Sequence, residues 1–195
     1  MLMSSFGYSQ ITGSAHDFSG ENWNNTGEIC IVCHTPHNAD ITVPDAPLWN
    51  HEVTATATFT LYNSPSFDGA ATIGQPSGAS KLCLSCHDGT VAMDNFGGRT
   101  NGGDFMTGSE LVGTDLSNDH PISFTYDAAL ASTDGGLYDP TSANSGLGGT
   151  INDDLLLAGQ LQCSSCHDVH NGGNLNNLLR ISNAGSALCL TCHNK

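Results

Sequence analysis

The eight cysteines of this 195-residue chain constrain its folding more than any other feature. They form four pairs with two residues between the cysteines, and a histidine directly follows each pair. No cysteine lies outside this pattern, which disfavours a framework of disulfide bonds. The motifs end in the triplets Cys30, Cys33 and His34; Cys83, Cys86 and His87; Cys163, Cys166 and His167; and Cys189, Cys192 and His193.

The Cys-x-x-Cys-His spacing is typical of c-type haem attachment. Two thiols on one turn of chain can add across the two vinyl groups of a haem, and the next residue places its imidazole beneath the iron as the fifth ligand. A thioredoxin-like redox pair would occur once, and a zinc ribbon gives no reason for a histidine after every pair. Four such motifs predict four covalently bound haem c groups, with the eight cysteines as thioether links and the four histidines as proximal ligands.

The composition agrees with an interior that side chains alone do not fill. Only 38% of the residues are hydrophobic, and glycine occurs 23 times. A disordered acidic chain would share this composition, but the regular cysteine spacing argues against that reading. We therefore expect the haems to supply the missing core.

Charge and hydropathy exclude several classes of partner. Nineteen acidic residues against four basic ones give a net charge of −15, and Lys81, Arg99, Arg180 and Lys195 form no cluster in the sequence. A chain of this kind is not expected to bind nucleic acid. No apolar run is long enough for a membrane span. Residues 1–20 lack the pattern of a signal peptide, so we expect that any such segment has been removed.

Five histidines remain after the four proximal ligands are assigned, and four irons need four distal ligands. Methionine would raise the potential, but only Met93 and Met106 are plausibly placed. The match between supply and demand predicts bis-histidine coordination and low potentials, with one histidine spare or acting elsewhere. The distal candidates are His16, His37, His51, His120 and His170.

The positions of these histidines carry further information. His37 and His170 each lie three residues beyond a proximal histidine, too close to reach the opposite face of the same haem. Each should therefore ligate a neighbouring haem, which requires two porphyrins to lie close together. His51 and His120 lie beside apolar or aromatic residues that could wall a haem, whereas His16 lies in a polar segment.

The chain looks internally duplicated, and we expect a single tetrahaem domain over residues 1–195. Residues 1–96 would hold haems 1 and 2, residues 151–195 haems 3 and 4, and the Gly/Asn/Asp-rich residues 97–150 a connecting loop with little regular structure. Alternation over residues 53–62 predicts a strand or hairpin arm. Short helical turns are expected within 155–161 and 176–180. The predicted fold is mostly irregular coil, with short helices and one or two short strands around four stacked haems.

Several segments resemble multihaem cytochromes with doubled haem-binding motifs. They are Ser14-Ala-His16-Asp, Gly27-Glu-Ile-Cys30 through Pro36-His37-Asn, Pro47-Leu-Trp-Asn-His51 and Gly74 to Cys83. The chain is most similar to extracellular tetrahaem cytochromes that polymerise into filaments, the cytochrome nanowires of metal-reducing bacteria and some archaea. The resemblance spans about residues 14–193.

This resemblance implies long-range electron transfer rather than enzymatic catalysis. The haems would alternate between parallel-stacked and T-shaped pairs and continue across subunits, with one haem ligated by the adjacent protomer; His16 is the candidate for that bridge. Partners would be further copies of the chain, other redox proteins and extracellular electron acceptors. Because −15 charges oppose self-association, a filament would need extensive buried contact, and bound divalent cations at the interfaces are expected to help.

Two other functions remain open at this point. One is a monomeric periplasmic shuttle that docks weakly on redox partners. The other is a multihaem reductase in which one haem lacks a distal ligand. Haem c is attached outside the cytoplasm, so every reading places the chain there, and the filament reading places it outside the cell.

Overall fold

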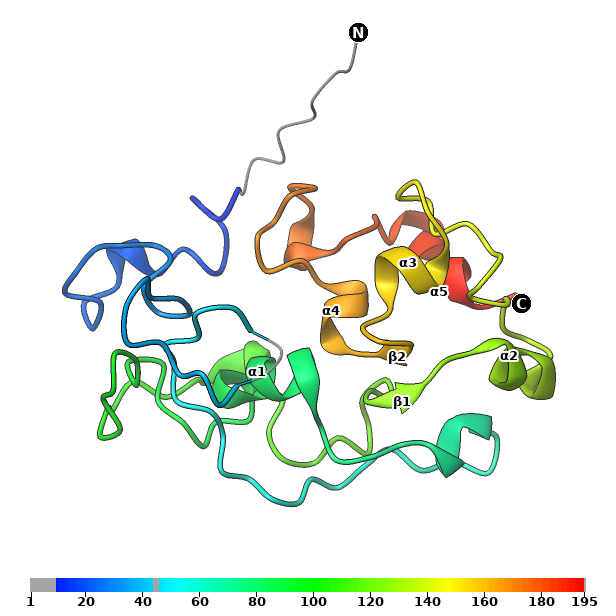
Figure 1. Ribbon diagram of the computed structural model, residues 1–195, viewed down its shortest axis with the longest axis horizontal. Coiled ribbons are helices and arrows are strands. Elements are labelled where there is room, and N and C mark those ends of the chain that lie inside the picture. Colours follow the sequence, from blue (N-terminus) through cyan, green and yellow to red (C-terminus); the bar gives the residue numbers. More distant parts are fainter. Residues whose placement is uncertain (1–9, 44–45, 195) are drawn as a thin grey trace, which may run out of the picture.

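The computed structural model describes residues 10–43 and 46–194, and Lys195 lies outside them. Coil dominates the described chain, with short regular elements between long loops (Figure 1). The helices are α1 (Gly78–His87), α2 (Ala128–Asp134), α3 (Ile151–Leu155), α4 (Cys163–Cys166) and α5 (Ala187–Cys192), and the strands are β1 (Phe124–Thr125) and β2 (Gln160–Leu161). Single 3-10 turns occur at Phe18–Gly20, Asp68–Ala71, Gly108–Glu110, Asn176–Leu178 and Ala184–Ser186. The expected class, mostly coil with short helices and short strands, is confirmed.

Each Cys-x-x-Cys-His motif lies on one turn of helical backbone. Helices α1, α4 and α5 carry three of them, and the first motif forms a comparable turn outside any assigned helix. In the first motif, the histidine N–H donates to the carbonyl of Cys30 at 2.8 Å, and the third and fourth motifs repeat this bond at 3.0 and 2.9 Å. Because residues three apart share a helix face, this turn brings the two thiols of a motif to the same side.

A small apolar core forms between residues 124–131 and residues 151–161. Strands β1 and β2 pair antiparallel, with Phe124 opposite Leu161. Phe124, Tyr126 and Ala131 are buried together with Ile151, Leu155 and Leu161. Residues 97–150 therefore contribute β1, α2 and part of this core, rather than surface loop alone.

The expected strand over residues 53–62 is wrong. The segment is extended, and only Thr60 forms an isolated bridge, with Asp115. Side chains take the place of a partner strand: the Phe59 N–H donates to Gln75 Oε1 at 2.6 Å, and Gln75 Nε2 donates to the Phe59 carbonyl at 3.2 Å. The alternation in this segment thus reflects one-sided burial of Thr54 and Phe59 without sheet pairing.

The two short helical turns are found in part. The 3-10 turn Asn176–Leu178 lies within 176–180, whereas 155–161 contains the end of α3 followed by a tight turn, closed by a bridge between Leu157 and Gln160, that leads into β2. Among the residues that the structure describes, no helix combines the length and apolar character needed to cross a membrane.

Candidate functional site

Successive attachment motifs are neighbours in space. The first and second motifs meet at Cys33 and Cys86, where burial and then the Cys33 thiol raise the pKa of the Cys86 thiol to about 12. Helices α1 and α4 pack together and bring the second motif to the third. A hydrogen bond between the thiols of Cys83 and Cys163 raises the pKa of Cys83 and lowers that of Cys163 to about 7.

The third and fourth motifs meet in the same way. Burial and then the Cys166 thiol raise the pKa of the Cys192 thiol to about 11. The order of the motifs in space therefore follows their order in the sequence. Neighbouring tethers of this kind can hold their cofactors close together.

Backbone carbonyls fix the orientation of five of the candidate ligands. In each of these rings, Nδ1 lies 2.7 to 3.0 Å from a carbonyl oxygen, which requires Nδ1 to carry the proton. Nε2 then keeps its lone pair for a metal, which is the arrangement that metal-binding histidines usually show. The pairs are His34 with Pro47, His51 with Glu52, His87 with Glu110, His120 with Pro121, and His167 with Asn177.

Three proximal histidines each lie opposite one distal candidate, at a spacing that would fit one iron. The ring centres of His34 and His170 are 6.4 Å apart and their planes lie within 18° of each other. Bonds of about 2 Å from a metal to each of two imidazoles, plus the half-width of each ring, give a separation of about 6 Å. These spacings fit one iron between each pair of rings. The other pairs are His87 with His16 at 6.2 Å and His193 with His120 at 6.3 Å.

His16 lies beside a proximal histidine of its own chain, His87. Burial, and then the neighbouring His87, lower the pKa of His16 to about 4, so the ring is neutral at pH 7, as a metal ligand must be. Its placement beside His87 favours a ligand role within its own subunit rather than the bridging role that we expected from the resemblance.

Three predicted ligands are not brought into such pairs. Within residues 10–43 and 46–194, no ring contact joins His167 to His37 or to His51. His37 is exposed, whereas His51 is only 3% exposed, with Nε2 3.6 Å from Cys86 Sγ.

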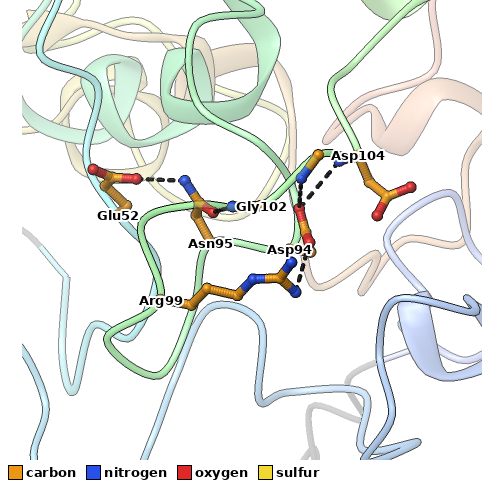
Figure 2. Close-up of polar contacts among 7 residues, drawn as sticks. Glu52, Asp94, Asn95, Arg99, Gly102 and Asp104 are labelled. Atoms are coloured by element: carbon orange, nitrogen blue, oxygen red, sulfur yellow. Dashed lines mark hydrogen bonds and ion pairs between the residues drawn. The ribbon is translucent and has the colours of Figure 1, made fainter.

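A loop that sequence reasoning missed encloses His51. The Glu52 N–H donates to the Asn95 carbonyl at 2.8 Å, and Asn95 Nδ2 donates to the Glu52 carboxylate at 2.5 Å. Figure 2 shows this loop, residues 94–104, where Asp94 accepts from the backbone N–H groups of Gly103 and Asp104 and pairs with Arg99 at 2.7 Å. These contacts hold the carbonyl that accepts from His51 Nδ1. The nearest sequence signal is the pair of glycines at 102 and 103.

Buried hydrogen-bond donors beside the motifs also lack acceptors. His16 Nδ1, Trp49 Nε1 and Arg180 Nε are buried without a partner in the described chain. Trp49 lies edge-on to His34, with ring centres 6.1 Å apart. Haem c carries two carboxylates, which are suitable acceptors for such donors. The thiols, the oriented imidazoles and these donors together fit the group that the motifs predict.

A family model described as a doubled CXXCH motif matches residues 157–195. The match indicates a multihaem c-type cytochrome. It covers the third and fourth motifs, about a fifth of the chain, and it supports haem binding and electron transport. No curated protein matches the chain in a sequence comparison. If the chain binds haem as this match suggests, the cysteine pairs would tether the haems and the histidines that follow would ligate the irons. When bound, haem supplies a one-electron iron couple.

Proposed function

We propose that the chain binds four bis-histidine haem c groups and forms the repeating subunit of an extracellular filament that conducts electrons over long distances. The observation that carries the haem assignment is the set of three facing histidine pairs, at the first, second and fourth motifs. Two axial histidines leave no open position for a substrate, which favours electron transfer over catalysis. Electron transfer is also what the doubled CXXCH match suggests.

The residues of the chain have separate tasks in this function. Neighbouring thiol pairs hold successive cofactors close together. Short distances are needed because the rate of electron tunnelling falls steeply with distance. The bonds from Nδ1 to backbone carbonyls hold five of the imidazoles in one tautomer and orientation, so that little reorganisation accompanies a change of charge. Burial of ligands such as His16 keeps water away and helps to set the potential.

The haem assignment is tested by removing one distal ligand at a time. His120→Ala and His170→Ala should each convert one of four low-spin ferric haems to a high-spin form, measured by electron paramagnetic resonance, with all four haems still attached by mass. Ser132→Asp, on the exposed face of α2, serves as a control that should keep four low-spin haems. Unchanged low-spin spectra in both histidine variants would contradict the assigned pairs.

The absence of a facing histidine at the third motif, among the described residues, supports the filament part of the proposal. In the described chain His167 faces no other histidine ring, and His37 is exposed and equally unpaired. We assign His37 of one subunit to the haem at His167 of the next, in place of His16. His51, buried beside Cys86, is then the spare histidine.

This bridge is tested with His37→Ala and His51→Ala. The first should abolish filaments and leave one high-spin haem per subunit, whereas the second should form filaments with four low-spin haems. The opposite result would make His51 the ligand of the third haem within the chain and remove the need for a bridge.

A periplasmic shuttle is the second candidate, and the charge of −15 supports it because like charges oppose self-association. Negative-stain microscopy of the secreted fraction separates the two readings. Fibres that disassemble when divalent cations are chelated are expected for the filament. Dispersed particles alone, together with a periplasmic location, would establish the shuttle instead.

A further inference from the structure

Arg180 is anchored directly beside the third haem-attachment motif. Its backbone N–H donates to the Cys166 carbonyl at 2.9 Å, and the preceding residue, Leu179, bridges to His167. At the end of the side chain, Nη2 donates to the backbone carbonyl of Asp154 at 2.9 Å. The backbone of Arg180 is therefore held beside Cys166 and His167, and its guanidinium is held at the end of α3.

The guanidinium has an unused donor and no carboxylate partner in the described chain. Arg180 Nε is buried without an acceptor, which is costly for a charged donor. Among the described residues, the Asp154 carboxylate forms no ion pair with Arg180; its Oδ2 instead accepts from the Ser145 hydroxyl and from the Gly149 N–H at 2.8 Å. By contrast, Arg99 is half exposed and pairs with Asp94 at 2.7 Å.

We infer that Arg180 binds a carboxylate of the haem attached at Cys163 and Cys166. This inference rests on the haem part of the proposed function but not on the filament part. A guanidinium matches the two oxygens of a carboxylate better than any other side chain does. In a chain with four basic residues, the Arg180 guanidinium supplies a local positive charge at one haem in particular.

The expected consequence is a higher midpoint potential at the third haem. The ferric form carries one more positive charge than the ferrous form, so a fixed cation nearby disfavours oxidation. Removing the cation should lower one of the four potentials and leave the other three in place.

The test is spectroelectrochemical titration of the haem-loaded protein with Arg180→Gln and Arg180→Lys. The glutamine variant should lower one potential, and the lysine variant, which keeps the charge, should retain most of it. Ser132→Asp on α2 makes the same change in net charge at an exposed position away from α4 and should move no single potential selectively (Figure 1). Four unchanged potentials in Arg180→Gln would overturn the inference.

A second measurement covers the case in which Arg180→Gln does not fold. The resonance Raman band for bending of the haem carboxylates should shift between the wild type and Arg180→Lys, because the geometry of the ion pair differs. An unchanged band would also overturn the inference. Failure of the proposed function would look different, because the wild type would then contain fewer than four haems or a high-spin population.

Discussion

Replacing Gly102 by alanine should damage the loop that encloses His51. A Cβ at this position would lie within 2.5 Å of Asn95 Oδ1 and closer still to Asp94 Oδ1. Both acceptors are nearly inaccessible, with Asp94 2% and Asn95 5% exposed. Neither can move freely, because Asn95 Oδ1 accepts from the Gly102 N–H at 2.6 Å and Asp94 Oδ1 accepts from the Gly103 N–H at 3.1 Å.

The size of the effect follows from two costs. Overpacking a close-packed site costs about 1–3 kcal/mol, and a buried acceptor that loses its donor costs about 1–3 kcal/mol more. We therefore expect Gly102→Ala to lower the free energy of unfolding by about 3 kcal/mol. In a chain of this length, that corresponds to a fall in Tm of about 6–12 °C.

The adjacent Gly103 provides the matched control. A Cβ there meets no atom within 4 Å, and neither glycine has a positive φ, so backbone strain does not distinguish the two variants. Gly103→Ala should change the free energy of unfolding by no more than about 0.5–1 kcal/mol in either direction. Guanidinium unfolding of the haem-loaded proteins, followed by far-ultraviolet circular dichroism, measures both. Equal transition midpoints for the two variants would refute the close-packing argument.

Two further predictions concern stability elsewhere in the chain. Tyr126→Phe should lower the free energy of unfolding by about 1–2 kcal/mol, because the buried hydroxyl donates to the Tyr138 carbonyl at 2.6 Å. Tyr138 is 39% exposed, so Tyr138→Phe should change the free energy of unfolding by no more than about 0.5 kcal/mol in the same assay. Hydrogen bonds from Thr150 lower the pKa of Asp153 in the folded protein. The stabilisation that Asp153 contributes is therefore complete above the pKa that it has in the unfolded chain, and it is lost as the pH falls through its lower pKa in the folded state. The stability difference between wild type and Asp153→Asn should therefore shrink from pH 6 to pH 3, and a difference independent of pH would contradict this.

The loops around the motifs show which features follow from local sequence. A motif such as Cys163 to His167 needs only one helical turn to present two thiols and an imidazole, so its chemistry can be predicted without knowledge of the fold. Low apolar content likewise predicts a chain with little regular structure. The alternation in 53–62 misled because it records burial on one side, and sheet formation also needs a partner strand.

The distal ligands and their surroundings depend on contacts between distant parts of the chain. His170 faces His34, and His16 faces His87, although no spacing rule joins these residues. The same holds for Asn95 beside Glu52 and for the unpaired Nε of Arg180. The tethers, the proximal ligands and the number of haems to expect can be read from the sequence, because those depend on neighbouring residues. Which imidazoles lie opposite each other, and where buried donors lack acceptors, emerge from the folded chain, because both depend on how remote loops pack together.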